Sequence, residues 1–308
     1  MRAQLLLPAL AAALLSLSAC DIEDWGDSHR YQQDFHYSFP LKSDGRVSIE
    51  SFNGAVEISG WDRNTVDIGG AKYGPSQEAA DALKIDISNS PEEISVRAVR
   101  PSDRRGNIGA RFTIKIPRGA RLDRVVTSNG SIHTMDGAGP ARLRSSNGSI
   151  HVQDLQGSLD AETSNASVEL LNIAGDAIVH SSNGHIHADG LTGSLDANTS
   201  NAGINAKIGE AAKSVRLGTS NGSVDLSLPA NFASDLRVNT SNSSITVRIP
   251  REPNARLVAH TSNSSISSDF DLRLQGRIDK NHVEGTLGNG GALMDLGSSN
   301  GSIRLLRM

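Results

Sequence analysis

The sequence predicts an all-β protein: a single-stranded β-solenoid with coils of 18–21 residues and a capping β region on its N-terminal side. The first reason is a Thr/Ser-Ser-Asn triplet that recurs nine times along the 308 residues. Its asparagines are separated first by 18 residues, then by 20 or 21, and finally by 37. Self-similarity at a period of about 20 residues marks a repeat architecture in which each repeat is one turn of a stack. Such a stack offers long, regular faces.

Aligned copies of the repeat also place apolar residues and glycines in fixed columns. The column ten residues after the asparagine holds only glycine in the first four copies: Gly139, Gly157, Gly175 and Gly193. Apolar and polar residues alternate on both sides of it, which is the period of a β-strand. Because glycine permits a tight corner, each coil is expected to contain two short strands. The column three residues after the asparagine is always Ile or Val: Ile132, Ile150, Val168, Ile186, Ile204, Val224, Ile245, Ile266 and Ile303.

The asparagine of the triplet is predicted to form a ladder that points inward. A meander of hairpins with Asn-Gly turns is the alternative, but those turns need glycine at the second position. That position changes to Ala166, Ala202, Ser243 and Ser264, whereas the asparagine never changes. We therefore expect each amide to bond to the next coil and to its corner backbone, since a buried amide must be satisfied. The predicted ladder comprises Asn129, Asn147, Asn165, Asn183, Asn201, Asn221, Asn242, Asn263 and Asn300.

Composition separates the repeats from the first third of the chain. Nine of the eleven aromatic residues lie between Trp25 and Phe112, which leaves Phe232 and Phe270 for the repeats. The two parts are therefore built differently. The net charge of −4 gives no basic surface for phosphate contacts, so nucleic acid is not expected as a partner.

Residues 1–19 are predicted to be a lipoprotein signal peptide, with a positive first segment, an apolar run and small residues before the cleavage point. The run Leu17-Ser18-Ala19-Cys20 resembles the bacterial lipobox, whose cysteine receives a diacylglycerol thioether and is then N-acylated. Cys20 is the only cysteine, so it has no disulfide partner within the chain. Several acyl chains would hold the protein on a membrane almost permanently.

The rest of the chain divides into three predicted parts. Residues 20–33 are the lipidated cysteine and a tether, on the periplasmic face of the inner or outer membrane, with Asp21 favouring the inner one. Residues 34–126 form the N-terminal capping region with degenerate repeats. They include one short helix over 75–84, which Pro opens and helix formers continue. Residues 127–308 form the solenoid repeats, closed by a degenerate coil or closing element before the final triplet.

Two features that suggest an enzyme have structural explanations. Gly218–Gly222 and Gly297–Gly301 match the G-x-S-x-G nucleophile elbow, which needs its serine on a strand-to-helix turn. Here the serine is the second residue of the triplet, and a strand is expected to follow. Asp160 and Asp196 share a column two coils apart, as in polysaccharide-cleaving β-helices, but Ile178 stands between them. We therefore predict no catalytic residue and no cofactor.

One column carries metal-ligating side chains. His133, His151 and His187 share it, with Glu169 between them and His185 two residues before His187. A parallel stack would bring them into a row on one outer face at about 4.8 Å per coil, where they could hold Zn²⁺ or Cu²⁺. Later copies place Asn205, Asp225, Thr246 and Ser267 in this column, which is typical of a solvated polar face. No metal site is therefore predicted; the candidate ligands are His151, Glu169, His185 and His187.

Several features together resemble one bacterial family. They are the lipobox, the degenerate unit Ser51-Phe52-Asn53-Gly54 with Gly60-Trp61-Asp62 after it, the turn Ile116-Pro117-Arg118-Gly119, and the serial TSNG-I units. Over roughly residues 35–308 the chain resembles the putative-adhesin family of β-strand-repeat proteins, a domain of unknown function. It is similar to the head domains of auto-transporter adhesins. The resemblance implies no catalytic residues, since the family has none established. It implies a cell-envelope setting, because some members accompany envelope stress systems.

These observations lead to one expectation and two alternatives. We expect a non-enzymatic, lipid-anchored cell-envelope protein whose solenoid serves a binding or structural role, with an envelope protein or a glycan as partner. The first alternative is a carbohydrate-binding or polysaccharide-cleaving β-helix. Scarce aromatics in the repeats count against it, because aromatic rings are the usual stacking platforms for sugars. The second alternative is an envelope-stress accessory or spacer with no ligand.

Overall fold

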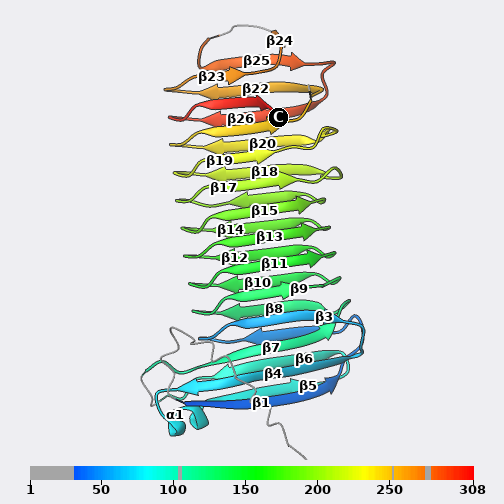
Figure 1. Ribbon diagram of the computed structural model, residues 1–308, viewed down its shortest axis with the longest axis vertical. Coiled ribbons are helices and arrows are strands. Elements are labelled where there is room, and N and C mark those ends of the chain that lie inside the picture. Colours follow the sequence, from blue (N-terminus) through cyan, green and yellow to red (C-terminus); the bar gives the residue numbers. More distant parts are fainter. Residues whose placement is uncertain (1–30, 103–105, 252, 275–278) are drawn as a thin grey trace, which may run out of the picture.

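The computed structural model describes residues 31–102, 106–251, 253–274 and 279–308, which form two long β-sheets facing each other along one axis (Figure 1). Sheet A, which begins with β1, has 13 strands, and sheet B, which begins with β5, has 14. Successive repeats add one strand to each sheet, and each strand pairs in parallel with its counterpart in the neighbouring coil. The prediction of an all-β solenoid with two strands per coil is confirmed.

The strands and the helix have the following bounds. The first third contains β1 (Tyr31–Pro40), β2 (Arg46–Glu50), β3 (Val56–Trp61), β4 (Thr65–Gly74), α1 (Gln77–Ala82), β5 (Lys84–Asn89), β6 (Glu93–Val99), β7 (Gly109–Pro117) and β8 (Arg121–Thr127). The repeats contain β9 (Ile132–Met135), β10 (Ala141–Ser145), β11 (Ile150–Leu155), β12 (Leu159–Thr163), β13 (Val168–Ile173), β14 (Ala177–Ser181), β15 (Ile186–Leu191), β16 (Leu195–Asn198), β17 (Ile204–Ile208) and β18 (Ser214–Thr219). They continue with β19 (Val224–Ser227), β20 (Asp235–Thr240), β21 (Ile245–Ile249), β22 (Ala255–Thr261), β23 (Ile266–Ser268), β24 (Leu272–Leu274), β25 (His282–Leu287), β26 (Ala292–Ser298) and β27 (Ile303–Arg307).

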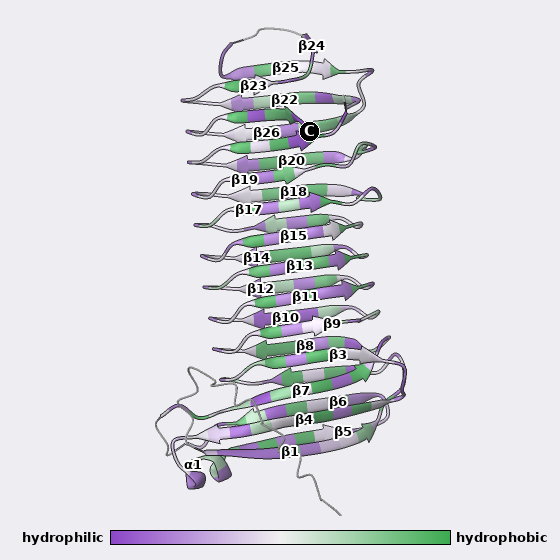
Figure 2. Ribbon diagram, viewed as in Figure 1, coloured by the Kyte–Doolittle hydropathy of each residue, from purple (hydrophilic) through white to green (hydrophobic). Residues whose placement is uncertain are grey.

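The column of Ile and Val side chains builds the core on the side of sheet A. Ile150 lies in register with Ile132 on one side and Val168 on the other, and all three are fully buried. Hydrophobic and hydrophilic residues alternate along the strands, as Figure 2 shows by its green and purple segments. This alternation follows from the strand period of two, so each strand has one apolar face and one polar face.

The predicted asparagine ladder is present, but it does not point inward. Each amide Nδ2 donates to the Oδ1 of the asparagine in the neighbouring coil at 2.6–2.8 Å, in a series that begins at Asn53 and ends at Asn263. Several amides also reach a backbone carbonyl, as Asn147 reaches Ser128 at 3.3 Å. All nine triplet asparagines are nevertheless exposed. The inward orientation was wrong, because the triplet bends into a surface turn at its second residue, where the amide bonds its neighbours and still meets water.

The first residue of the triplet is the one that points inward. The Ser145 hydroxyl donates to the Gly130 carbonyl at 3.1 Å and accepts from the Gly148 N–H at 2.9 Å. In four triplets this hydroxyl bonds backbone groups both in its own turn and in a neighbouring coil. In the other five it makes one of these two bonds, so every one of these buried hydroxyls has a partner, as burial of a polar group requires. The buried first residues of the triplets are Thr127, Ser145, Thr163, Ser181, Thr199, Thr219, Thr240, Thr261 and Ser298.

The order of the coils departs from the order of the sequence at the C-terminal end. Strand β26 lies between β20 and β22 in sheet B, and β27 lies between β21 and β23 in sheet A. The Asn300 amide accordingly donates to Asn242, while Asn263 donates to Asn300. The last coil of the sequence, formed by β26 and β27, thus lies between the coil of β20 and β21 and the coil of β22 and β23. Strands β24 and β25 pair in antiparallel fashion and close this end, as the expected closing element.

The N-terminal end is closed by antiparallel strands. In sheet A, β4 pairs with both β1 and β7 in antiparallel fashion, and in sheet B, β5 pairs with β6 in the same way. Helix α1 connects the two sheets between β4 and β5; Ser76 caps it by accepting from the Ala79 N–H at 3.2 Å. It is shorter than the predicted 75–84, since the strand β5 begins at Lys84. In the part of the chain that the structure describes, no helix is long and apolar enough to cross a membrane.

Candidate functional site

The predicted histidine column lies on the outer face of sheet A. Strands β3, β9, β11, β13 and β15 are parallel neighbours, and each contributes one residue to a row. Each of these residues directly follows a fully buried Val or Ile, so strand alternation turns it to the outer face. In register, the row is Glu57, His133, His151, Glu169 and His187.

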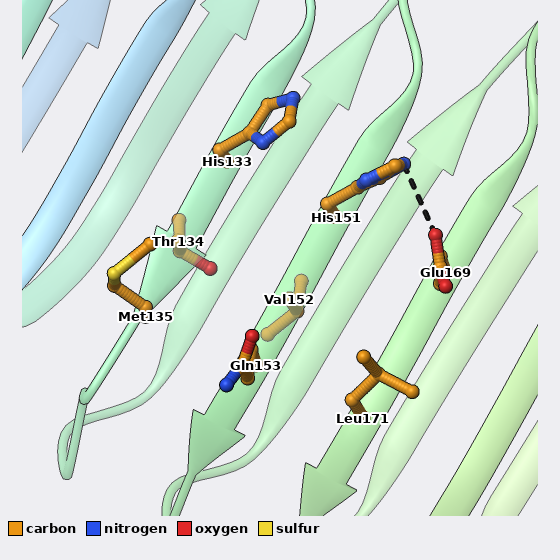
Figure 3. Close-up of a pocket in the computed structure, with 8 residues that line it drawn as sticks. All are labelled: His133, Thr134, Met135, His151, Val152, Gln153, Glu169 and Leu171. Atoms are coloured by element: carbon orange, nitrogen blue, oxygen red, sulfur yellow. Dashed lines mark ion pairs between the residues drawn. The ribbon is translucent and has the colours of Figure 1, made fainter.

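The centre of this row is a chain of close side-chain contacts. The rings of His133 and His151 are tilted by 40° with their centroids 4.7 Å apart. On the other side, His151 Nε2 lies 3.3 Å from Glu169 Oε2 (Figure 3). His151 is therefore held between a second imidazole and a carboxylate, because parallel pairing without a bulge keeps the three strands in strict register.

A second row lies two residues further along the same strands. Figure 3 shows Met135, Gln153 and Leu171 beside the three titratable residues. Met135 is 46% exposed, although its side chain is large and apolar. The two rows line a hollow of about 140 Å³, and a second hollow of about 300 Å³ adjoins it at His133 and Met135. We call this surface the histidine groove and define it by His133, Met135, His151, Gln153, Glu169 and Leu171.

The environment of the histidine groove disfavours a positive charge on His151. Partial burial lowers the pKa of His151 below the ordinary 6.5, and repulsion by His133 lowers it further. The Glu169 carboxylate opposes this by favouring the charged imidazole. Burial and the nearby His187 likewise lower the pKa of His185. The neutral forms of His151 and His185 are therefore favoured near neutral pH.

The structure brings together only part of the candidate metal set. Glu169 contacts His151 and lies in register with His187 in the next strand. His185 precedes β15, at the end of the triplet turn. Within the described ranges, no group of three or more His, Cys, Asp or Glu side chains is placed to hold a metal ion. A flat row presents its ligands from one side, whereas structural zinc sites surround the ion tetrahedrally.

The two G-x-S-x-G motifs have the local structure expected from the repeat. Ser220 and Ser299 are exposed and lie in surface turns. The turns lead into strands β19 and β27. A nucleophile elbow instead leads into a helix, so neither serine has the setting that this chemistry needs.

The two aspartates two coils apart are engaged separately. Asp160, Ile178 and Asp196 are in register across β12, β14 and β16, as the column predicts. Asp160 forms an ion pair with Arg144 at 2.7 Å, and Asp196 accepts from the Asn198 amide at 2.6 Å. The apolar Ile178 lies between them and is 48% exposed. Each acid is thus engaged by a neighbouring side chain of its own, and an apolar side chain occupies the position between them.

Sequence reasoning found the titratable row and missed the apolar one. Met135, Gln153 and Leu171 lie two residues after His133, His151 and Glu169, so strand periodicity places them on the same face. That periodicity was the available signal. Cys20 and Asp21 lie outside the described residues, so the lipid anchor remains a prediction.

Comparison with known proteins concerns the fold. A family model described as Toastrack DUF4097 matches residues 46–248. One similar solved structure is a putative cell adhesion protein from Clostridium sporogenes, with 11% identity, 90% of this chain and 100% of that chain covered, and a TM-score of 0.28. A second is a putative adhesin from Bacteroides fragilis, with 12% identity, coverage of 89% and 97%, and a TM-score of 0.38. A third is a putative lipid binding protein from Parabacteroides distasonis, with 10% identity, coverage of 89% and 97%, and a TM-score of 0.43. At such scores these likenesses carry no functional argument. No curated protein matches the chain.

Proposed function

Since the chain belongs to the Toastrack DUF4097 family, we propose that it is a non-enzymatic, lipid-anchored protein of the bacterial cell envelope that binds another envelope protein through its histidine groove. Membership of the family accounts for the scaffold, a stack of coils with flat faces. The side chains of this chain decide what such a face offers to a partner. The matched residues include all the strands that carry the groove.

The make-up of the histidine groove is the observation that carries the binding role. Met135 and Leu171 provide apolar contact on the outer face of a sheet, where they contribute nothing to the core. Methionine adapts its shape to an apolar partner. The imidazoles and Glu169 beside them supply donors and acceptors. Because paired strands hold the backbone of all six residues in place, a partner would bind a surface whose backbone needs no ordering.

The size of the hollows supports binding of a protein over catalysis on a small molecule. Pockets for small ligands usually enclose about 300–1,000 Å³ and bury most of the ligand. The hollows of the histidine groove, at about 140 and 300 Å³, lie at or below the bottom of that range. A shallow surface with apolar side chains at its centre and polar side chains around them is instead typical of a protein–protein interface.

The anchor follows from the lipobox at Cys20. Ten residues lie between it and Tyr31, where β1 begins, which makes eleven steps along the chain. At about 3.3–3.6 Å per residue, this tether spans at most about 40 Å. Lipidation would therefore keep the N-terminal end of the solenoid near the membrane, with the histidine groove several strands above it.

The anchor is tested by labelling cells with an alkyne analogue of palmitate and separating their membranes. The wild-type chain should carry the label and sediment with membranes, whereas the Cys20→Ser variant should lose both properties. Equal labelling of the two proteins would contradict lipidation at Cys20.

The groove is tested by placing a photo-crosslinking amino acid at Gln153 in intact cells, with His180 on the outer face of sheet B as the matched control position. One crosslinked protein specific to Gln153 is expected. Its yield should fall when Met135→Asp is added, because a charge at this position opposes apolar contact. Identical crosslinks from both positions, or none from Gln153, would reject the groove as the binding surface.

A further inference from the structure

A second groove lies at the N-terminal end of the molecule, where both sheets stop. Strands β1 and β5 are the terminal strands of sheets A and B, and each has a strand on one side only (Figure 1). Between them is an open groove of about 600 Å³, lined by residues from β1, β4, α1, β5 and β6. It is larger than either hollow of the histidine groove, and no coil formed by the described residues covers it.

The walls of this terminal groove are partly apolar because they continue the inner faces of the sheets. Tyr37 pairs with the fully buried Ile68, and on the opposite wall Ile85 pairs with the buried Ala98. Phe35 packs edge-on against Phe112 at a centroid distance of 5.5 Å. Further along the solenoid, such inward side chains are covered by the next coil. Here Tyr37 stays 39% exposed, so the groove presents apolar surface to a ligand.

The terminal groove also contains a cation. Lys72 lies in register with Gln33 of β1 and with the buried Ala110 of β7. It has the same parity along β4 as Ile68, so its side chain belongs to the inner face of sheet A. Among the described residues, its ammonium has no hydrogen bond or ion pair. The lining of the groove also contains Lys84 and three aspartates, Asp34, Asp81 and Asp86. Lys84 and Asp86 flank Ile85 along β5, and Asp34 precedes Phe35 along β1, so strand alternation turns these three charged side chains away from the inner faces. The unpaired ammonium of Lys72 therefore lies on the same inner face as Phe35 and Tyr37.

We propose that the terminal groove binds a long-chain fatty acid, whose carboxylate contacts Lys72 and whose alkyl chain lies against Phe35, Tyr37 and Ile85. The carboxylate would accept a charge-assisted hydrogen bond from the ammonium, and the alkyl chain would cover surface that the end of the stack leaves open. The Gln33 amide lines the same groove and supplies a further donor. This inference uses neither the anchor nor the histidine groove, so it stands or falls separately from the proposed function.

An inward lysine near the end of a sheet could instead serve only to discourage pairing with other chains. That role requires no ligand, and a binding experiment separates the two. The mature chain (20–308) carrying Cys20→Ser needs no detergent and keeps every described residue. It is titrated with cis-parinaric acid, a fluorescent fatty acid that brightens in apolar surroundings. We expect cis-parinaric acid to bind saturably at one site. Palmitate should displace it, and the methyl ester of palmitate, which lacks the charge, should be at least about tenfold less effective as a competitor.

Variants locate the site. Lys72→Met should weaken binding of cis-parinaric acid about tenfold, since it keeps the length of the side chain and removes the charge. Lys207→Met removes the same charge from the outer face of β17, and we expect it to leave the affinity for cis-parinaric acid unchanged. Ile85→Asp should abolish binding, with Tyr37→Ser as a second variant if the first fails to fold by circular dichroism. The proposal is overturned if binding does not saturate, if the ester competes as well as palmitate, or if Lys72→Met binds normally.

Discussion

At the scale of single residues, the buried hydroxyl of the triplet is expected to stabilise the fold through its hydrogen bonds to the backbone. The Thr219 hydroxyl donates to the Ala202 carbonyl at 3.0 Å and accepts from the Gly222 N–H at 3.1 Å. Thr219→Val keeps the shape of the side chain and leaves both backbone groups without this partner. We expect a loss of about 1–3 kcal/mol in the free energy of unfolding, measured by urea denaturation.

The matched control for that substitution is Thr246→Val, on the outer face of β21. Thr246 is half-exposed, so its hydroxyl can be replaced without stranding a buried group, and valine suits a strand. The free energy of unfolding should change by less than about 0.5 kcal/mol. Similar losses in the free energy of unfolding at the two positions would show that the buried hydroxyl of Thr219 stabilises the protein no more than an exposed one.

His151 gives the folded protein a dependence on pH. Its pKa is lowered in the folded state, so the unfolded chain binds the proton more readily. Its contribution to stability is therefore complete above the unfolded pKa of about 6.5 and is lost as the pH falls through the lower folded pKa. His151→Gln removes this loss and leaves the facing His133 and Glu169 in place. The decrease in Tm between about pH 8 and about pH 5, measured by calorimetry, should be smaller in the variant. Equal decreases would contradict the prediction.

At the scale of elements, the glycine corner is fixed by the approach of successive coils. A Cβ built on Gly157 would overlap the carbonyl of Gly139 in the neighbouring coil, and backbone cannot move aside as a side chain can. Gly157→Ala should therefore cost about 1–3 kcal/mol in the free energy of unfolding. A Cβ at Gly137 would meet only the flexible end of Leu155, so Gly137→Ala is the control. Equal effects of the two substitutions in chemical denaturation would refute close approach as the reason for the glycine.

The elements also show which features the sequence could predict. The strands of the repeat follow from the column of Ile132, Ile150 and Val168 and from period-two alternation, and the structure confirms them. The face to which the first side chain of the triplet points could also have been predicted. Its first residue lies two positions after a buried residue, as Thr163 follows Ala161, and so shares the inner face. The invariance of the asparagine correctly indicated a ladder. It did not indicate whether the ladder is buried or exposed, because an amide can bond its neighbours in the core and at the surface.

At the scale of the whole molecule, the family resemblance is confirmed by the family model, whereas the order of the coils could not be predicted. Each coil presents the same columns to its neighbours, so local pattern does not distinguish one stacking order from another. The inserted last coil is therefore decided by the connections and by antiparallel closure. The terminal groove has the same origin: its residues follow a strand pattern, and only the end of the stack leaves them uncovered.

The insertion of the last coil predicts which turns can be joined by a disulfide. In a Cys20→Ser background, the pair Asn242→Cys and Asn300→Cys occupies neighbouring rungs, whose amides are 2.8 Å apart in the native ladder. Neighbouring strands lie about 4.8 Å apart, within the Cα separation that a disulfide spans, whereas two rungs lie beyond it. This pair should oxidise readily, and the pair Asn242→Cys and Asn263→Cys should not, as mass spectrometry of peptides can show. Asn263→Cys with Asn300→Cys is the positive control, since these rungs are neighbours in either order. A disulfide between positions 242 and 263 alone would establish stacking in the order of the sequence.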